Sequence, residues 1–335
     1  MFLARPRTWL VGALIGCVVL GFCQDRIDPY FVDILTRIGI NIVLAVSLNL
    51  INGHTGQFSL GHAGFMAIGA YMAANMTLNY EPHVLPANGG TASHMLWFML
   101  ALLASGIIAA AAGLLVGAPS LRLKGDYLAI VTLGFGQIIS VVFRNIPSLG
   151  GALGLNGMPP YTNLFWVFAT GAITVYVVTT MVNSTYGRGF IATNDDEVAA
   201  EAMGINTTRC KIVAFVIGAF FAGIAGGLYA HFELTINPKG FDFNRSIEIV
   251  VIVIVGGMGN TIGVIIAAIL LALLPEGLRT LAGYQIPLPW SSTPWSLRWI
   301  GESRPLLYSM LLIGLMLLRP QGLFNLRRRG AKEPC

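Results

Sequence analysis

The chain has 335 residues, of which 55% are apolar and 10% charged, and its formal net charge is +5. Its mean hydropathy of +0.73 excludes a water-soluble globular protein and predicts an integral membrane protein. The positive charge is typical of contact with anionic lipid, and no interleaved aromatic and basic patch indicates a nucleic-acid partner.

Apolar runs that are long enough to cross a hydrocarbon layer of about 30 Å recur along the whole chain, which predicts an all-α bundle of about ten transmembrane helices (8–10). The expected spans are 8–23, 31–51, 62–78, 95–117, 127–144, 163–183, 211–230, 247–258, 260–277 and 305–318, and the eighth is shorter than a full crossing. The first run follows Arg5 and Arg7 as a signal peptide would. Because it is long for that role and no Ala-x-Ala site follows, we expect a retained helix.

Basic residues between the spans predict the orientation, because they concentrate on the cytoplasmic side of a membrane. A cytoplasmic N-terminus places twelve of them inside: Arg5, Arg7, Arg122, Lys124, Arg188, Arg209, Lys211, Arg319, Arg327, Arg328, Arg329 and Lys332. Six then lie outside: Arg26, Lys239, Arg245, Arg279, Arg298 and Arg304. We therefore expect both termini in the cytoplasm.

Two glycine-rich polar stretches interrupt the apolar runs, at residues 52–64 (NGHTGQFSLGHAG) and 256–263 (GGMGNTIG). Irregular backbone at membrane depth is tolerated only where protein or a watery cavity satisfies it, so the pair is typical of a transport path. Two tight turns between neighbouring helices explain the pattern equally well. The candidate path residues are Asn41, Ser47, Asn49, Gln57, Ser59, His62, Thr132 and Gln137, for which hydrogen bonding between helices is the alternative. His54 and His62 are eight residues apart, which fits no common metal motif, and no metal site is predicted.

A polar island at residues 183–211 indicates a short helix outside the membrane. Asn194 has the position of an N-cap, Glu197 completes a capping-box spacing, and Gly204 is a stop signal. Asp195 and Asp196 then face the positive end of the helix dipole. A helix of about ten residues is marginal alone in water, so we expect it to be stabilised by docking against another protein. The docking side chains would be Val198, Ala202 and Ile205.

The sequence carries no motor and no ion relay of its own. It has no phosphate-binding loop, no nucleophile elbow, no metalloprotease motif and no dinucleotide fingerprint, so the chain is not predicted to be an enzyme. Charged residues within the spans are few: Asp33 and Arg37 are spaced to pair, and Arg144, Glu248 and Glu276 lie near span ends as interfacial anchors. A transport path in this chain must be passive or driven by a partner.

Four blocks of the sequence resemble LivM-type permeases of branched-chain amino-acid ABC importers. They are Asn41–Tyr71 (NIVLAVSLNLINGHTGQFSLGHAGFMAIGAY), Leu121–Gly136 (LRLKGDYLAIVTLGFG), Tyr186 through Tyr229, and Ile254–Gly263 (IVGGMGNTIG). In the third block, the resemblance is carried by Tyr186-Gly-Arg-Gly, Glu201-Ala-Met-Gly204 and the run from Ala214 to Tyr229.

The resemblance implies an ABC importer permease fold with two related halves in a bacterial cell inner membrane. The implied division is 1–30, an N-terminal helix and periplasmic connection; 31–183, the first transmembrane half; 184–210, a cytoplasmic ATPase-coupling loop; 211–318, the second half; and 319–335, a basic cytoplasmic tail. The implied partners are a LivH-like permease, two cytoplasmic ABC ATPases and a periplasmic amino-acid-binding protein. ATP and Mg²⁺ would bind in the ATPases, and this chain would hold no cofactor.

The implied mechanism is alternating access driven by the ATPases through the coupling loop. Its residues would be Asn194, Asp195, Asp196, Glu197, Val198, Glu201, Ala202 and Gly204. Glu201-Ala-Met-Gly204 is a shortened match to the Glu-Ala-x-x-x-Gly pattern of such loops, with glycine two positions after Ala202. Two alternatives stay open, namely an importer of urea, short amides or other amino acids, and a passive channel for a small neutral solute.

Overall fold

The computed structural model describes residues 6–84, 90–120 and 126–282, together with 285–286, 295–296, 309–310, 313–314, 317 and 322. The helices are α1 (Pro6–Cys23), α2 (Pro29–Asn49), α3 (His62–Asn75), α4 (Glu81–Val84), α5 (Thr91–Ser120), α6 (Asp126–Asn145), α7 (Leu164–Val182), α8 (Thr185–Asp195), α9 (Glu197–Ala202), α10 (Thr207–Glu233), α11 (Phe243–Gly256) and α12 (Thr261–Ala282). Two-residue strands pair as β1 (Leu155–Asn156) with β2 (Thr235–Ile236), and as β3 (Gln285–Ile286) with β4 (Trp295–Ser296).

The prediction of an all-α membrane protein is confirmed, and a helix lies at each of the first nine expected spans. Six described helices are long and apolar enough to cross a membrane: Pro29–His54, Thr91–Ser120, Tyr127–Asn145, Leu164–Val182, Thr207–Glu233 and Thr261–Thr280. The expected count of about ten is not confirmed. α11 has 14 residues, or about 21 Å of helix, and a bilayer core needs about 30 Å. α3 also has 14 residues, but a π-helical turn at Met76–Tyr80 continues it to α4.

Several expectations fall on residues that the structure does not describe. The expected tenth span, 305–318, is described only at 309–310, 313–314 and 317, all helical. The tail 319–335 is described only at Gly322, and Arg5, Arg122 and Lys124 lie outside the described residues too.

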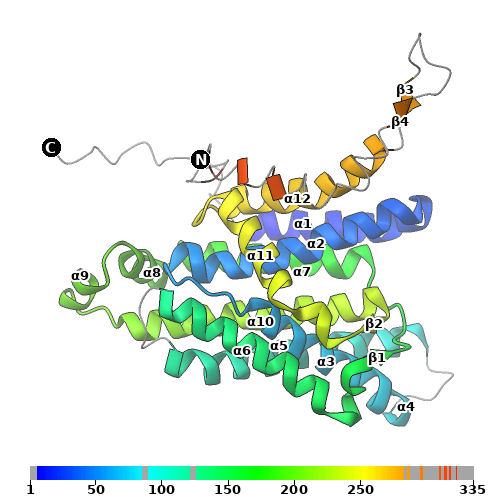
Figure 1. Ribbon diagram of the computed structural model, residues 1–335, viewed down its shortest axis with the longest axis horizontal. Coiled ribbons are helices and arrows are strands. Elements are labelled where there is room, and N and C mark those ends of the chain that lie inside the picture. Colours follow the sequence, from blue (N-terminus) through cyan, green and yellow to red (C-terminus); the bar gives the residue numbers. More distant parts are fainter. Residues whose placement is uncertain are drawn as a thin grey trace.

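The long helices run lengthwise along the molecule, with α8 and α9 at one end and α4, β1 and β2 at the other (Figure 1). We call these the α9 end and the α4 end. The β1–β2 pair joins the α6–α7 connection to the α10–α11 connection, with Leu155 opposite Ile236. Gly154, just before β1, has a φ of 79°, and a methyl group there would overlap the carbonyl of Ile236. Glycine is therefore required where these two connections meet.

Helix α10 lies at the centre, packed against α2, α3 and α5. Glycines allow the closest approach, because a methyl group on Gly69 of α3 would overlap the carbonyl of Gly223 of α10. Gly226 meets the carbonyl of Met66 in the same way, one turn further along. Such small-residue contacts are how helices pack in lipid, where no hydrophobic effect drives them together.

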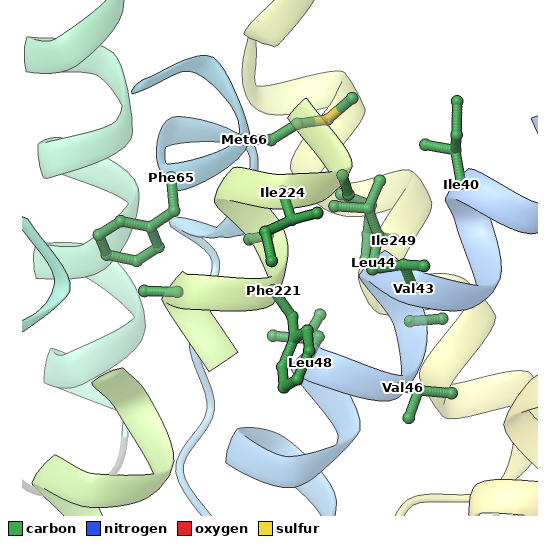
Figure 2. Packing of buried hydrophobic residues seen from close by; sticks show 14 of the residues in the cluster. Ile40, Val43, Leu44, Val46, Leu48, Phe65, Met66, Phe221, Ile224 and Ile249 are labelled. Carbon is green, nitrogen blue, oxygen red and sulfur yellow. The ribbon is translucent and has the colours of Figure 1, made fainter. Parts of the chain in front are cut away.

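Buried apolar side chains of α2, α3, α10 and α11 fill the space between these helices (Figure 2). Leu44 and Leu48 of α2 lie near Phe221 of α10 and Ile249 of α11. Each of these four side chains is at most 4% exposed. This core holds α2, which carries much of the candidate site, in one orientation.

A buried carboxylate joins the connections at the α4 end. Glu81 is 6% exposed, and its Oε1 accepts a hydrogen bond from the hydroxyl of Tyr161 at 2.6 Å and lies 2.6 Å from Nδ1 of His94. The ring of Tyr161 stacks on His231 of α10. Burial, followed by the hydrogen bond to Glu81 and the charge of that carboxylate, raises the pKa of Tyr161.

Candidate functional site

The first polar interruption is an irregular segment within the bundle. Helix α2 passes into a π-helical turn at Leu50–His54, a geometry that is frequent at functional sites, and residues 55–61 then form neither helix nor strand before α3 begins. In Figure 1 this stretch is the blue coil that runs from the α9 end towards α3.

Side chains satisfy the backbone of this irregular segment. The N–H of Ser59 donates to Asn52 Oδ1 at 3.2 Å, and the N–H of Leu60 donates to Thr132 Oγ1 of α6 at 3.0 Å. The N–H of Gln57 donates to the carbonyl of Ile51 at 3.1 Å. This is the condition under which irregular backbone is tolerated at membrane depth.

The second interruption is a tight turn between α11 and α12, closed by the N–H of Asn260 donating to the carbonyl of Gly257 at 3.1 Å. Gly257 and Gly259 have φ values of 93° and 81°, which glycine adopts without strain. The turn alternative therefore describes residues 256–263, whereas residues 52–64 form a longer irregular passage.

The two interruptions meet in space. The N–H of Gly259 donates to Oδ1 of Asn49 at 2.9 Å. A methyl group on Gly53 would overlap both Asn49 Oδ1 and the nitrogen of Gly259. Two polar stretches far apart in sequence therefore form one contact.

The polar island reaches the same place. Asn194, in the last turn of α8, donates from Nδ2 to the carbonyl of Gly53 at 3.3 Å. Gly56, with a φ of 68°, lies so close to Asn194 that a methyl group would overlap its side chain. We call Asn49, Gly53, Gly56, Asn194 and Gly259 the polar junction.

Ser47 and His62, both predicted path residues, are fully buried and paired. Ser47 Oγ lies 2.9 Å from both the carbonyl of Leu44 and Nε2 of His62. With the serine hydroxyl donating to Leu44, Nε2–H of His62 donates to Ser47 Oγ, and Nδ1 is left as an acceptor.

Buried polar atoms without a hydrogen-bond partner among the described residues gather on this part of the chain. They are Asn49 Nδ2, Asn52 Nδ2, Gln57 Nε2 and Oε1, Ser59 Oγ and His62 Nδ1. Each such group costs about 1–3 kcal/mol, and a polar solute passing along the segment would satisfy them. These unpaired buried atoms belong to the irregular segment and the helix ends beside it, and we call them the polar lining of the segment.

Three further predicted path residues have separate positions. Asn41 is 8% exposed on α2 and accepts a hydrogen bond from Arg245 at 3.2 Å. Thr132 holds the backbone of Leu60, as described above. Gln137 is only half-buried on α6 and joins none of the hydrogen bonds that tie the described junction and segment together.

The polar island folds as two helices rather than one. Asp196 is the N-cap of α9, and its Oδ1 accepts from the N–H groups of Val198 and Ala199 at 2.9 and 3.1 Å. The prediction of Asn194 as the cap was therefore wrong by two residues, because Asn194 is still helical and is held by Gly53. Asp195 ends α8. Gly204 has a φ of 80° and, as predicted, ends the helix.

Helix α9 is held by the start of α10. Lys211 Nζ donates to Glu197 Oε1 at 2.7 Å, and the hydroxyl of Thr207 donates to Glu201 Oε1 at 2.7 Å. The opposite face is apolar and open, with Val198 70% and Met203 83% exposed. Ala202 is exposed on that face as well. The expected contacts of Val198 and Ala202 with a partner remain sterically available.

Charged residues near the helix ends are paired, as predicted for Asp33 and Arg37, which lie 3.2 Å apart. The other ion pairs are Arg37–Glu233 at 2.9 Å, Arg144–Asp242 at 3.2 Å, Arg245–Glu248 at 2.6 Å and Arg279–Glu276 at 3.4 Å. Within the described residues, no group of three histidine, cysteine, aspartate or glutamate side chains is placed to bind a metal ion.

Sequence reasoning missed Asn52, Gly53, Lys211 and Arg245 as parts of these arrangements. Asn52 and Gly53 stand next to each other in the first interruption, so the signal for that region was present. Lys211 gave no such signal, because its partner Glu197 lies on another helix. Arg245 pairs with Glu248 in its own helix, but its bond to Asn41 of α2 has no local signal.

The family described as "Branched-chain amino acid transport system / permease component" matches residues 30–319. The LivM permease proteins of the high-affinity branched-chain amino acid transport systems of Salmonella typhimurium and Escherichia coli K12 are both 32% identical to the chain, over 97% of it and 76% of their own length. The LivH permease protein of the E. coli K12 system is 25% identical over 69% of this chain and 79% of its own length. No solved structure matches the chain.

Proposed function

The chain belongs to the family of branched-chain amino acid transport system permease components, and from this premise we propose that it is the transmembrane permease subunit of an ATP-driven importer for branched-chain amino acids. The 32% identity to two LivM proteins over 97% of the chain supports the cargo. The similarity to LivH supports a second permease subunit of that type as its partner in the membrane.

The observation that carries the ATP-driven part of the proposal is the open apolar face of α9. Val198 of the six-residue helix α9 is 70% exposed and Met203, which follows it, is 83% exposed, while Lys211 and Thr207 hold the helix through Glu197 and Glu201. Exposed apolar side chains outside the membrane are available for a protein contact. We infer that an ABC ATPase docks there, and that Asp195 and Asp196 face basic residues of it.

The polar junction offers a route for force. Because Asn194 is bonded to Gly53, a displacement of α8 and α9 by the ATPase acts directly on the end of α2 and, through Asn49, on the α11–α12 turn. We infer that ATP-driven closure of two ATPases rearranges the irregular segment and its polar lining. This is alternating access with the motor outside the chain, and ATP and Mg²⁺ bind in the ATPases.

The remaining parts of the assembly follow from this assignment. The α9 end faces the cytoplasm, both termini lie on that side, and the membrane is a bacterial inner membrane. A periplasmic amino-acid-binding protein delivers the cargo at the α4 end. The polar interruptions at residues 52–64 and 256–263 lie in the two expected halves of the chain. Their contact supports an ABC importer permease fold with related halves and about ten membrane helices.

Reconstitution tests the proposal. The chain is purified with its LivH-like subunit, two ATPases and the binding protein, and leucine uptake into liposomes is measured with and without ATP. We expect uptake only with ATP, and competition by isoleucine and valine but not by urea or short amides. Uptake that is indifferent to ATP would indicate a passive channel and contradict the proposal, and competition by urea or amides would overturn the cargo alone.

Variants of α9 separate docking from folding. Val198→Asp and Met203→Asp should release the ATPases from the purified membrane subunits. The matched control is Leu153→Asp, which places the same charge at an 85% exposed leucine beside β1, at the other end of the molecule. Retention of the ATPases by both α9 variants would rule out this face as the docking surface.

A further inference from the structure

Arg245, at the start of α11, is held between three helices near the α4 end. Its Nη1 donates to Glu248 Oε2 at 2.6 Å, and its Nη2 donates to Asn41 Oδ1 of α2 at 3.2 Å. Its guanidinium carbon lies 5.8 Å from the centre of the Tyr229 ring of α10. The side chain of Arg245 is 21% exposed and that of Glu248 is 44% exposed, so the pair is open on one side of this chain.

This arrangement differs from the other arginine in the region. Arg37 lies one helical turn from Asn41, is half exposed and is shared by two carboxylates, Asp33 and Glu233. Both arginines lie over an aromatic ring, Phe232 for Arg37 and Tyr229 for Arg245, but Arg245 has one carboxylate and one neutral amide in place of two carboxylates. A guanidinium has five N–H donors in a planar fork, so donors remain beside the two that the chain occupies.

The pair adjoins the irregular segment. Ser246, the residue after Arg245, accepts a hydrogen bond at Oγ from the N–H of Ala63 at 3.4 Å, which places the start of α11 against the start of α3. The unpaired polar atoms of Ser59 and His62 lie at that end of the irregular segment. A solute bound at Arg245 would therefore lie next to the polar lining.

We propose that Arg245 and Glu248, with Asn41 and Tyr229, bind the zwitterionic head group of an α-amino acid. The guanidinium takes the carboxylate, and the carboxylate of Glu248 takes the ammonium group. One carbon separates the two charged groups of an α-amino acid, which suits a guanidinium and a carboxylate that already touch. This inference rests on the proposed function and assigns a site within it.

The chemistry of the site predicts that a ligand must carry both charged groups to bind well. A zwitterion replaces one ion pair by two and leaves both charges partnered. A solute with only one of its charges leaves either Arg245 or Glu248 without a partner, and unpaired polar groups in a binding site are the strongest source of discrimination. An exposed ion pair of this kind is weak enough to be exchanged.

Competition binding tests the site directly. The binding protein is left out of the purified complex, so that its own selectivity does not affect the result. Radiolabelled leucine then binds in competition with one of three unlabelled ligands: leucine, leucinamide or 4-methylpentanoate. Leucinamide has no carboxylate, and 4-methylpentanoate has no ammonium group. On the unaltered complex, both analogues should compete at least tenfold less well than leucine. Equal competition by all three would overturn the proposal without any variant.

Two variants should each lose the discrimination against one of the two analogues. Arg245→Gln should narrow the gap between leucine and leucinamide, and Glu248→Gln should narrow the gap between leucine and 4-methylpentanoate. A merely structural ion pair would shift all three ligands together. The matched control is Arg279→Gln, which breaks a similar i,i+3 pair with Glu276 on α12 and should leave the ranking of the ligands as it was.

Different outcomes contradict the proposed function and the head-group site. If the unaltered complex shows no ATP-dependent leucine uptake, the proposed function falls. If it imports leucine, but Arg245→Gln and Glu248→Gln keep the unaltered ranking of the three ligands, the head-group site alone is wrong.

Discussion

The backbone N–H of Gly259 donates a hydrogen bond to the side-chain oxygen of Asn49 at 2.9 Å, across 210 residues of sequence. Asn49 is fully buried at the end of α2, and Gly259 lies in the turn between α11 and α12. The bond therefore fixes the end of α2 to the start of the last long described helix. Several expected effects of substitution depend on this contact and its neighbours.

Replacing Asn49 by leucine keeps its approximate size and removes the acceptor. The N–H of Gly259 loses its side-chain partner, at a cost of about 1–3 kcal/mol, and removal of the unpaired Asn49 Nδ2 offsets part of it. The expected net result is a lower thermal unfolding temperature of the purified complex. The control is Asn145→Leu, at an exposed asparagine that donates to the carbonyl of Val141 in its own helix. Equal unfolding temperatures for the two variants would show that the Asn49 contact is energetically neutral.

A methyl group at Gly53 overlaps Asn49 Oδ1 and the nitrogen of Gly259, so Gly53→Ala should separate the two interruptions. The expected destabilisation is about 1–3 kcal/mol, as for other overpacked sites, with reduced leucine uptake. Gly134→Ala in α6 is the matched change, because nothing lies within 4 Å of the added carbon. That variant should be as stable as the unaltered protein or slightly more so, measured in the same thermal assay.

Asn194→Ala removes the bond between α8 and Gly53 and leaves α9 and its apolar face unchanged. We expect the ATPases to assemble and hydrolyse ATP, while the leucine imported per ATP falls about fivefold, the size that the loss of about 1 kcal/mol predicts. Asn183→Ala is the control, since that side chain donates to Thr179 within its own helix at 2.7 Å. An unchanged ratio of leucine to ATP in Asn194→Ala would place the transmission of force elsewhere.

The raised pKa of Tyr161 predicts a pH dependence of stability. The folded state holds the phenolic proton more tightly than the unfolded state does, so this contribution is complete below the ordinary tyrosine pKa of about 10. It is lost as the pH rises towards the higher folded value. Tyr161→Phe removes the hydrogen bond to Glu81 and should unfold at a lower temperature at pH 7.

Unfolding temperatures measured from pH 7 to 11 check both parts of this prediction. The difference between the unaltered protein and Tyr161→Phe should shrink above about pH 10. A difference that stays constant to pH 11 would mean that Tyr161 ionises at the same pH in both states.

Hydropathy was sufficient to place the helices, because lipid requires long apolar runs wherever a helix crosses it. It misplaced the ends of α3 and α11, because a π-helical turn carries the first to Tyr80 instead of residue 78, and the second runs from Phe243 to Gly256 instead of 247–258. The end of helix α9 before Gly204 was predictable, since a glycine after a helical run favours a left-handed conformation that stops the helix. The start was not, because Asn194, Asp195 and Asp196 are all acceptable caps.

Tertiary contacts decided what the sequence left open. Asn194 stays helical because Gly53 accepts its amide, and Glu197 is drawn to Lys211. The buried positions of Ser47, Asn49, Gln57, Ser59 and His62 were identifiable as polar residues in an apolar setting. The connection of this region to Gly259 and Asn194 was not, because no local pattern records which distant residues touch.

Each residue of the irregular segment 55–61 can span more distance than a helical residue does. A helical residue advances the chain by about 1.5 Å, whereas a residue in open chain spans up to about 3.3–3.6 Å. No ladder of backbone hydrogen bonds fixes this stretch, and Asn52 and Thr132 hold its backbone at Ser59 and Leu60. Helix α3 is thus joined to α2 by irregular chain rather than by a continuous helix, and side chains of α2's π-helical turn and of α6 hold that connection in place.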